Sequence, residues 1–518
     1  MRPRVSPAKL QLIKPAMRPE PRLKSNRVGV LDIGSNSVRF VIYELFGAHF
    51  SPVYNEKVLA GLGRSLKASG KLSENGKALA FDNLLRFKTI ADAQGLGELL
   101  IGATAALRVA QDAPEFIAKV KDKIGLDITP ISGEEEARLT AMGMLAADHR
   151  AQGLAADLGG ASLEFVQVQD NVVAEGVSLK LGPFEMLGSS PARADNFTDK
   201  DIRAKIEKKL GKVDLTPFKG KALHLIGGAW RGLAAIHQKR ESYPMRTLQA
   251  YRLSPQDAQD LAQWAFGAGR EKVLAWPGIS ERRAETLPYS GYLLDMIMAR
   301  MQPSVVIIST TGLREGLVYD AMDPKLRERD SLMDGCRDLA RGNLQAVHFA
   351  DPLYQFLEGA AAHFPAFFPA ENENRLRQAA CQLAGIGKGL HPDYRADLVF
   401  DDVLYAPIAG LTHQERAYLA LILFSSYTGK SLPKNSTAVE ALLSDEARLY
   451  ARTYGAAMRL AIVATGRSAD LLSWFTLSVQ KGQLSLTVEP SNSALLSERV
   501  AYRLEKLAQL SGLSVNKA

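Results

Sequence analysis

Cysteine is nearly absent from this chain, which has two cysteines, Cys336 and Cys381, in 518 residues. Two thiols cannot build a disulfide framework or a cysteine-rich metal cluster, and their scarcity favours a reducing compartment. The chain also lacks any apolar run that approaches the length of a membrane span. We therefore expect a cytoplasmic protein that does not associate with a membrane.

An excess of positive charge is confined to the start of the chain. The first 26 residues contain seven Lys or Arg against one acidic residue, and they lack the apolar core of a secretory signal. Most of the net charge of +8 lies there, so the overall charge favours no particular partner. We interpret residues 1–26 as a disordered basic tail, and we expect no sequence-specific nucleic acid partner.

The rest of the chain divides by pattern into four predicted parts. Residues 27–145 and 146–325 alternate strand-like and helix-like segments, which is typical of α/β layers. Residues 326–435 are helical in pattern, with stretches such as ERAYLALILFSSYTG that we expect to be amphipathic. Residues 436–518 contain a hairpin around a Lys-Gly pair and a final helix, which indicates a small α+β domain.

A strand-turn-strand segment occurs twice. The first, VGVLDIGSNSVRFVIYEL, begins at residue 28, and the second, GLAADLGGASLEFVQV, begins at residue 153. Asp32 then aligns with Asp157, and Gly34 aligns with Gly159. One Asp-x-Gly turn is usually only a turn. Two matched copies predict two related lobes that face each other across a phosphate-binding cleft, an arrangement similar to the superfold of actin, the sugar kinases and the heat-shock ATPases.

Both turns offer the groups that bind phosphate. A glycine-rich turn after a strand exposes backbone N–H groups, which can bind phosphate oxygens, and nearby hydroxyls and amides add further donors. The candidate residues are Gly34, Ser35, Asn36 and Ser37 in the first turn and Gly159, Gly160, Ala161 and Ser162 in the second.

Carboxylates accompany both turns. Asp32 and Asp157 end their strands beside the turns, and Glu164 shares a strand face with Ser162. A carboxylate beside a phosphate is repulsive unless a cation lies between them, and Mg²⁺ is the natural cation for that role. We expect Asp32, Asp157 and Glu164 to bind Mg²⁺, or Mn²⁺ in its place, or to orient the attacking water.

Three consecutive glutamates follow a predicted helix start in the segment ISGEEEARL. Ser132 and Glu135 have the spacing of a capping box, and Glu134 suits the positive end of the helix. Glu136 has no such structural explanation, so it is the candidate to polarise a water for attack on a terminal phosphorus. The alternative is a solvated glutamate in an acidic first turn, and spacing alone leaves that alternative open.

Seven blocks occur in order before residue 325: VLDIGSNSVRFVIYE, ATAALR, ISGEEEARL, ADLGGASLEFV, IGGAWR, PGISERRAETLPYSG and TTGLREGLVYD. With these blocks the chain resembles the exopolyphosphatase / guanosine pentaphosphate phosphohydrolase family, strongly up to about residue 320 and more weakly beyond. The resemblance implies Mg²⁺-dependent release of terminal phosphate from inorganic polyphosphate, or hydrolysis of the 5′ γ-phosphate of guanosine pentaphosphate. It also implies that Glu136 is the catalytic glutamate.

The remaining candidate residues come from the same resemblance. Arg108 closes the block that contains Thr104, and the resemblance implies that it clamps phosphate. Gly227 and Gly228 lie where the superfold binds the distal or nucleoside part of a substrate. The alternatives are a surface arginine for Arg108 and a plain strand–helix turn for the two glycines.

Two departures from the family pattern stand out. Ala161 replaces the third glycine of the second turn, and its methyl group resists positive φ, so the fit of the substrate there is in doubt. In the helical part, relatives of the metal phosphohydrolase (HD) type carry a His-Asp pair where this chain has Ala384 and Gly385, which cannot bind metal. We therefore expect no second metal site, and we interpret His391 and His413 as surface or core residues.

These observations lead to a Mg²⁺-dependent exopolyphosphatase, with a homodimer contact expected in the helical HD-like domain. A guanosine pentaphosphate phosphohydrolase would use the same residues, and the sequence shows no guanine pocket that separates the two. A non-catalytic polyphosphate sensor is favoured only by Ala161 and the missing His-Asp pair. A small-molecule kinase of the same superfold would need an acceptor site, for which the sequence gives no sign.

Overall fold

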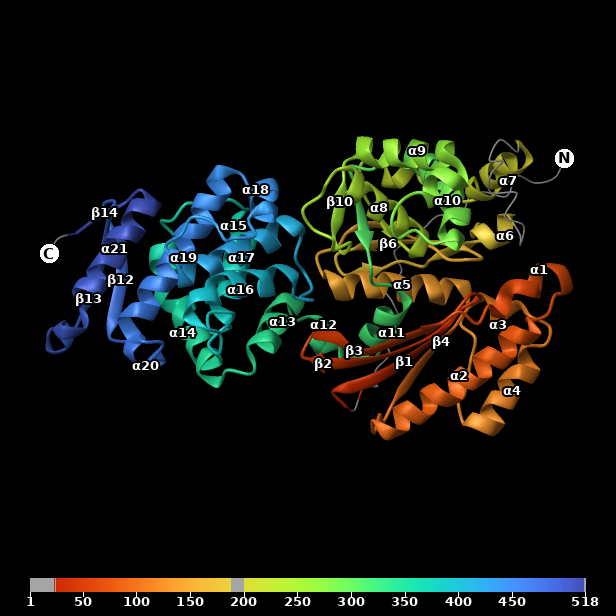
Figure 1. The fold of residues 1–518 in the computed structure, drawn as a ribbon, viewed down its shortest axis with the longest axis horizontal. Coiled ribbons are helices and arrows are strands. Elements are labelled where there is room, and N and C mark those ends of the chain that lie inside the picture. Colours follow the sequence, from red (N-terminus) through yellow and green to blue (C-terminus); the bar gives the residue numbers. More distant parts are fainter. Residues whose placement is uncertain (1–22, 24, 188–199, 517–518) are drawn as a thin grey trace. The chain divides into compact units, whose positions relative to one another are not determined.

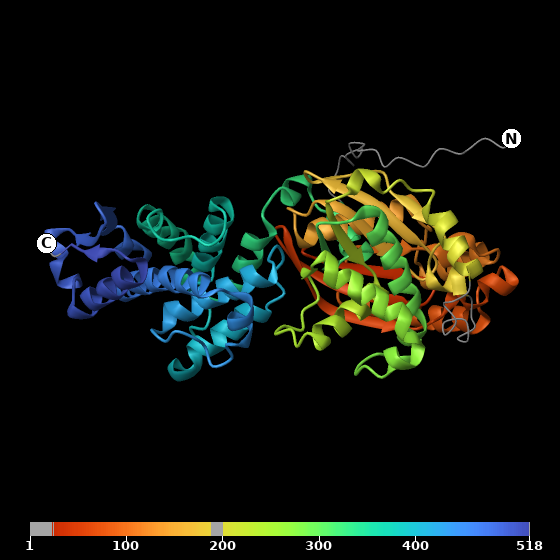
Figure 2. The same cartoon turned by 90° about the horizontal axis from the view of Figure 1, so that it is seen from above.

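The computed structural model describes residues 23, 25–187 and 200–516 (Figures 1 and 2). Nearly all of the predicted basic tail lies outside the described residues. The chain forms two compact units, the first ending at Arg329 and the second beginning at Asp330. The first unit contains two mixed sheets covered by helices, and the second is mainly helical, so the fold is mixed α/β as predicted. The division into four parts stays a prediction.

The first sheet of the first unit has the strand order β3-β2-β1-β4. Its strands are β1 (Arg27–Ile33), β2 (Val38–Phe46), β3 (His49–Val58) and β4 (Leu99–Ala103). Strand β2 is antiparallel to β1, and β4 is parallel to it. Helix α2 (Glu74–Ala93) begins at the N-cap Ser73, buries one apolar stripe and ends before Gly95, whose φ is +64°.

The second sheet repeats this plan and extends it. Its order is β10-β11-β9-β5-β6-β7, with β8 also paired to β6. The strands are β5 (Gly153–Leu158), β6 (Leu163–Gln169), β7 (Val172–Val173), β8 (Val177–Leu179), β9 (Ala222–Ile226), β10 (Tyr251–Leu253) and β11 (Val305–Ser309). The run β7-β6-β5-β9 has the same order and strand directions as β3-β2-β1-β4. The duplication predicted from the sequence is therefore confirmed.

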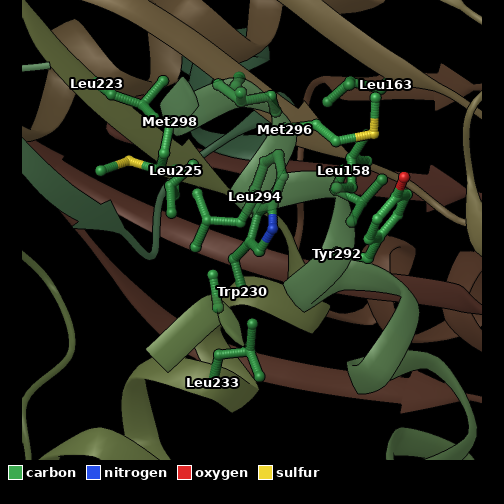
Figure 3. Close-up of a cluster of buried hydrophobic side chains, with 14 of the residues drawn as sticks. Leu158, Leu163, Leu223, Leu225, Trp230, Leu233, Tyr292, Leu294, Met296 and Met298 are labelled. Carbon is green, nitrogen blue, oxygen red and sulfur yellow. The ribbon is translucent and has the colours of Figure 1, made fainter. Parts of the chain in front are cut away.

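Helices surround both sheets of the first unit. Helices α9 and α10 pack side by side, and α8 packs against α10 and β9 (Figures 1 and 2). Trp230 of α8 lies among leucine and methionine side chains from β9 and α10 (Figure 3). The remaining helices are η1 (Leu62–Ser65), α1 (Leu66–Ser69), α3 (Ala105–Val109), α4 (Ala113–Ile124), α6 (Pro183–Leu187), α7 (Lys200–Leu210), η3 (Thr216–Phe218), α8 (Gly228–Arg240), α9 (Pro255–Leu274), α10 (Glu281–Met301) and α12 (Pro324–Arg327).

Helices α5 (Gly133–Ala147) and α11 (Leu313–Ala321) join the two sheets. Helix α5 packs on β6 and β8, α11 packs on β1 and β4, and the two helices cross in direct contact (Figure 1). The crossing is so close that a Cβ at Gly316 would lie 1.7 Å from the carbonyl oxygen of Leu139. A Cβ at Gly143 would lie 2.0 Å from the carbonyl oxygen of Gly312. Glycine at 143 and 316 therefore sets the distance between the two sheets.

The second unit packs its helices around α17 (His413–Tyr427). We expected α17 to be amphipathic, and this was wrong: all but one residue from 413 to 426 is buried, because the run AYLALILF offers no polar face. Its partners include α16 (Pro392–Tyr405) and α19 (Asp445–Thr465). The other helices are α13 (Ser331–Ala340), α14 (Leu344–Ala361), α15 (Ala370–Gln382), α18 (Thr437–Leu442), α20 (Ala469–Leu472), η4 (Pro490–Leu495) and α21 (Glu498–Ser511).

A small sheet, β12-β13-β14, completes the second unit. Its strands are β12 (Phe475–Gln480), β13 (Gln483–Val488) and β14 (Ser514–Val515). The predicted hairpin is confirmed, and Lys481 and Gly482 both have positive φ at its turn, as a two-residue hairpin loop requires. Within the described part of the chain, every helix is too short or too polar to cross a membrane.

Candidate active site

The two predicted turns have the same geometry. In the first, the backbone N–H of Gly34 donates to the carbonyl of Ser37 at 2.9 Å, and in the second Gly159 donates to Ser162 at 3.0 Å. Each turn joins antiparallel strands, and in each the preceding strand runs parallel to a strand that leads into a helix. The two segments are therefore structural copies and not two chance turns.

The first turn is held in place by hydrogen bonds from the loop that contains Gly61 and Gly63. Gly63 donates to the carbonyl of Ser35 at 2.7 Å, and Gly61 donates to the carbonyl of Asn36 at 2.9 Å. Thr104 is buried, and its backbone N–H donates to the carbonyl of Ile33 at 3.0 Å, which places it beside the turn. The amide oxygen of Asn36 is buried and has no partner among the described residues. This oxygen is an acceptor, so only a group that donates a hydrogen bond can satisfy it.

The second turn is covered by the segment that leads into α6. Phe184 donates its backbone N–H to the carbonyl of Gly160, and a Cβ at Gly160 would lie 2.8 Å from the Phe184 ring. Gly182 donates to the carbonyl of Ala161 at 2.9 Å. Ala161 does not have a positive φ, so the backbone conformation gives no reason to doubt this turn. How the methyl group affects the fit of the substrate stays a prediction.

Glu136 lies in the first turn of α5, and its side chain is 16% exposed, so it is not the solvated glutamate of the alternative interpretation. Nη1 of Arg108 lies 3.2 Å from its carboxylate and also donates to the carbonyl of Ile131. Burial raises the pKa of Glu136 to about 7, and the charges of Asp157 and Asp32 add to that rise, whereas Arg108 opposes it. Arg108 is therefore paired with the candidate base and is not an unattached surface arginine.

The helix start has one half of the predicted capping box, the bond to Ser132. The Ser132 hydroxyl accepts a hydrogen bond from the backbone N–H of Glu135 at 3.1 Å. The Glu135 carboxylate binds Arg138 through two hydrogen bonds, at 2.8 and 2.9 Å, which gives that glutamate a structural role. Glu134 is exposed at the same helix end. Of the three glutamates, Glu136 is thus the one directed toward the other candidate carboxylates.

Asp157 and Glu164 are cross-strand partners on β5 and β6, which places their Cβ atoms about 4.5–5.5 Å apart. Oδ2 of Asp157 accepts a hydrogen bond from Thr140 at 3.1 Å, and Glu164 accepts one from Ser178 at 2.8 Å. Burial raises the pKa of both carboxyls, and nearby negative charges add to both shifts. Two close carboxylates of this kind, one buried and one half-buried, can share a cation.

Asp32 has a different environment. Its carboxylate lies 3.5 Å from Nε of Arg314, the second residue of α11, and the charges of Arg39 and Lys57 also act on it. Burial raises the pKa of Asp32, and these three cations oppose that shift. The pKa values of Arg39 and Lys57 are lowered, first by burial and then by the nearby arginines. Glu315 lies 3.8 Å from Nη1 of Arg314, so three cations here face two acids, Asp32 and Glu315. The remaining positive charge favours an anionic ligand.

Gly227 needs to be glycine for two reasons. Its φ is +113°, and a Cβ there would lie 2.5 Å from the carbonyl oxygen of Leu158 and 3.1 Å from Oδ1 of Asp157. Both reasons are structural, so the role of Gly227 in binding substrate stays a prediction. A Cβ at Gly228 would meet nothing within 4 Å, so crowding does not explain that glycine.

Sequence reasoning missed several residues that the fold brings to this place. They are Arg39 on β2, Lys57 on β3, Thr140 on α5, Ser178 on β8, Arg231 on α8 and Arg314 on α11. One signal was available for Arg39: in the repeat it occupies the position of Glu164, and each of the two pairs with the aspartate of its own copy. The first copy thus pairs its aspartate with a cation and the second with an acid.

The predicted metal ligands do not form a closed cage. The described residues contain no group of three or more His, Cys, Asp or Glu side chains placed to hold a metal ion by themselves. In the second unit, a Cβ at Gly385 would lie 1.8 Å from the Cβ of Ala346, so α14 packs directly against that backbone. His391 is exposed at the start of α16, and His413 is buried in α17.

Two family models match this chain. One, described as the Ppx/GppA phosphatase family, matches residues 41–325, and the other, described as the C-terminal part of exopolyphosphatase, matches residues 335–517. The chain belongs to the Ppx/GppA phosphatase family. The family resemblance drawn from the seven sequence blocks is thereby confirmed.

Solved structures of Ppx/GppA proteins are also similar to this chain. A family member from Aquifex aeolicus is 24% identical, with a TM-score of 0.49 over 57% of this chain and 96% of that one. An exopolyphosphatase from Cytophaga hutchinsonii is 23% identical, with a TM-score of 0.48 over 57% of this chain and 96% of that one.

Proposed function

We propose that this Ppx/GppA protein is an exopolyphosphatase, which releases terminal orthophosphate from inorganic polyphosphate by attack of water. The observation that carries the proposal is a set of four carboxylates whose charges act on one another: Glu164 is buried, and Asp32, Glu136 and Asp157 are half-buried. Both family models support a phosphatase, and the model that matches residues 335–517 carries the name exopolyphosphatase.

Glu136 is the general base in this proposal. A base works best when its pKa lies near the working pH, and the pKa of Glu136 is raised to about 7. Arg108 lies 3.2 Å from the Glu136 carboxylate, where its charge orients the base and can contact an incoming phosphate oxygen. The two turns, with backbone N–H groups and serine hydroxyls, bind the terminal phosphates.

The donors beside the second turn fit Mg²⁺. Asp157 and Glu164 supply hard carboxylate oxygens, and Mg²⁺ commonly takes one or two carboxylates together with substrate phosphates. That preference agrees with the lack of a closed set of three ligands among the described residues. When bound, Mg²⁺ would neutralise charge on the transferred phosphoryl group. Asp32 faces a cationic environment, so we assign it to orienting water or substrate more than to binding the metal.

The test is phosphate release from long-chain polyphosphate and, in parallel, from guanosine pentaphosphate, each with Mg²⁺ and with EDTA. Glu136→Gln keeps the shape of the side chain and removes the base, so the rate should fall roughly 10²- to 10⁴-fold. Glu134→Gln, on the same helix turn and exposed, is the matched control and should keep the wild-type rate.

The outcomes separate the candidate functions. Release from polyphosphate that needs Mg²⁺ and Glu136 supports the proposal, and the ratio of the two rates names the preferred substrate. A wild-type rate in Glu136→Gln would show that the base is misassigned. If the wild type binds polyphosphate but releases phosphate from neither substrate, the protein is a polyphosphate sensor and not an enzyme. Release without any acceptor argues against a kinase.

A further inference from the structure

Thr140 uses its hydroxyl in an unusual way for a helix residue. A threonine inside a helix commonly donates to a carbonyl of the preceding turn. Thr89 and Thr465 do so here, each to the carbonyl four residues earlier. The Thr140 hydroxyl instead donates to a residue outside its helix, Oδ2 of Asp157, at 3.1 Å. Because threonine is a weak helix former, a role outside the helix is a physical reason for its presence.

Thr140 also lies where it can connect two parts of the site. Its side chain is 2% exposed, so its hydroxyl has little access to solvent as an alternative partner. It follows Glu136 by four residues on α5, which places the two side chains on one face of the helix. One turn of α5 therefore carries both the candidate base and the group that binds Asp157.

The two aspartates of the repeat are held by different chemistry. Arg314 forms an ion pair with Asp32, whereas Asp157 accepts a hydrogen bond from the neutral hydroxyl of Thr140. Arg231 acts on Asp157 through its charge, but it donates its hydrogen bond to the carbonyl of Thr310 at 2.9 Å. Thr140 thus fixes Oδ2 of Asp157 without neutralising the carboxylate, and Oδ1 lies on the side of Gly227.

We propose that Thr140 is a positioning residue that orients Asp157 for a divalent cation at the second turn. The proposal rests on the proposed function, which needs a cation there. Partners that orient a metal ligand change metal affinity by about 10- to 100-fold when they are removed. Loss of the Thr140 hydroxyl should therefore weaken Mg²⁺ binding in that range, while leaving the fold intact.

The experiment compares the full-length wild type with Thr140→Val, Thr140→Ser and Thr465→Val. Binding of MgCl₂ is measured by titration calorimetry without substrate and again with inorganic pyrophosphate, and folding is checked by thermal melting. Thr140→Val should bind Mg²⁺ about 10- to 100-fold more weakly, and Thr140→Ser should restore most of the affinity. Thr465→Val removes an equally buried hydroxyl from the second unit and should bind Mg²⁺ as the wild type does.

Each other outcome overturns the proposal. It fails if Thr140→Val binds Mg²⁺ as tightly as the wild type, or if Thr140→Ser is as weak as Thr140→Val. It also fails if the wild type binds no Mg²⁺ with or without pyrophosphate. A protein that shows the expected Mg²⁺ pattern but releases no phosphate from polyphosphate would overturn the proposed function and leave the role of Thr140 standing.

Discussion

At the scale of single residues, the pKa of Glu136 determines the pH at which this residue can act as the proposed general base. Burial raises the pKa of its carboxyl to about 7, and Arg108 is the nearest group that opposes the rise. The base acts only when it is ionised. The rate of phosphate release should therefore increase with pH through the region near 7 and level off above it.

Replacing Arg108 should shift the pH dependence of phosphate release to higher pH. Arg108→Gln removes the cation that favours the ionised form of Glu136, so the pKa of Glu136 should rise and the acidic limb of the pH–rate profile should shift to higher pH. The maximal rate should also fall, because a phosphate contact is lost. The measurement is kcat/KM from pH 5 to 9.

Arg138→Gln is the control for this shift. Arg138 lies on the same helix but binds Glu135 and Asp320. Its replacement should therefore leave the midpoint of the pH–rate profile unchanged. If the midpoint of the pH–rate profile is unchanged or lower in Arg108→Gln, the acidic limb of the profile reflects the ionisation of a group other than Glu136.

At the scale of elements, the crossing of α5 and α11 determines how the two copies of the turn meet. Helix α5 carries Glu136 and packs on the second sheet, and α11 carries Arg314 and packs on the first. The two backbones touch through Gly143 and Gly316, where side chains would collide with carbonyl oxygens. The position of Glu136 relative to Asp32 thus depends on Gly143 and Gly316, which have no side chains and act only through the close packing of the two helices.

Gly316→Ala should separate these helices. The added methyl would lie 1.7 Å from the carbonyl of Leu139 unless the backbone shifts, and such overpacking costs about 1–3 kcal/mol. We expect a lower melting temperature together with a loss of phosphate release. Gly267→Ala, on α9 with nothing within 4 Å of the new Cβ, is the control and should be neutral or stabilising by up to about 1 kcal/mol. Equal melting temperatures for Gly316→Ala and the wild type would contradict the close crossing.

At the scale of the whole molecule, the chain is divided into two compact units at Arg329 and Asp330. The first unit contains the duplicated sheets and all of the candidate site, and the second has its own core around α17. A unit with its own core can fold alone. Unfolding of the full chain then need not be a single two-state step.

Separate production of residues 1–329 and 330–518 tests this division. Each fragment should show far-ultraviolet circular dichroism typical of folded protein and a cooperative melting transition. Calorimetry of the full chain should show a broadened or double transition that the two fragments reproduce in part. A fragment that stays unfolded would show that its core depends on the other unit.

The local sequence determined much of this protein. Hydrophobic alternation, N-caps and turn glycines act over a few residues, so the hairpins and the helix start at Ser132 followed from the sequence, as did the duplicated turns. The capping argument also singled out Glu136 without any tertiary information, although the Glu135 carboxylate binds Arg138.

Only the tertiary structure decided the charges around the two turns. Arg39, Lys57, Arg231 and Arg314 come from four separate elements, and no spacing rule joins residues 39 and 314. The backbone conformation at Ala161 was also decided by the fold, which does not give this residue a positive φ. The sequence sets which groups a turn presents, because those contacts are local. The fold sets the burial and charge that tune them, because those arise from residues hundreds of positions apart.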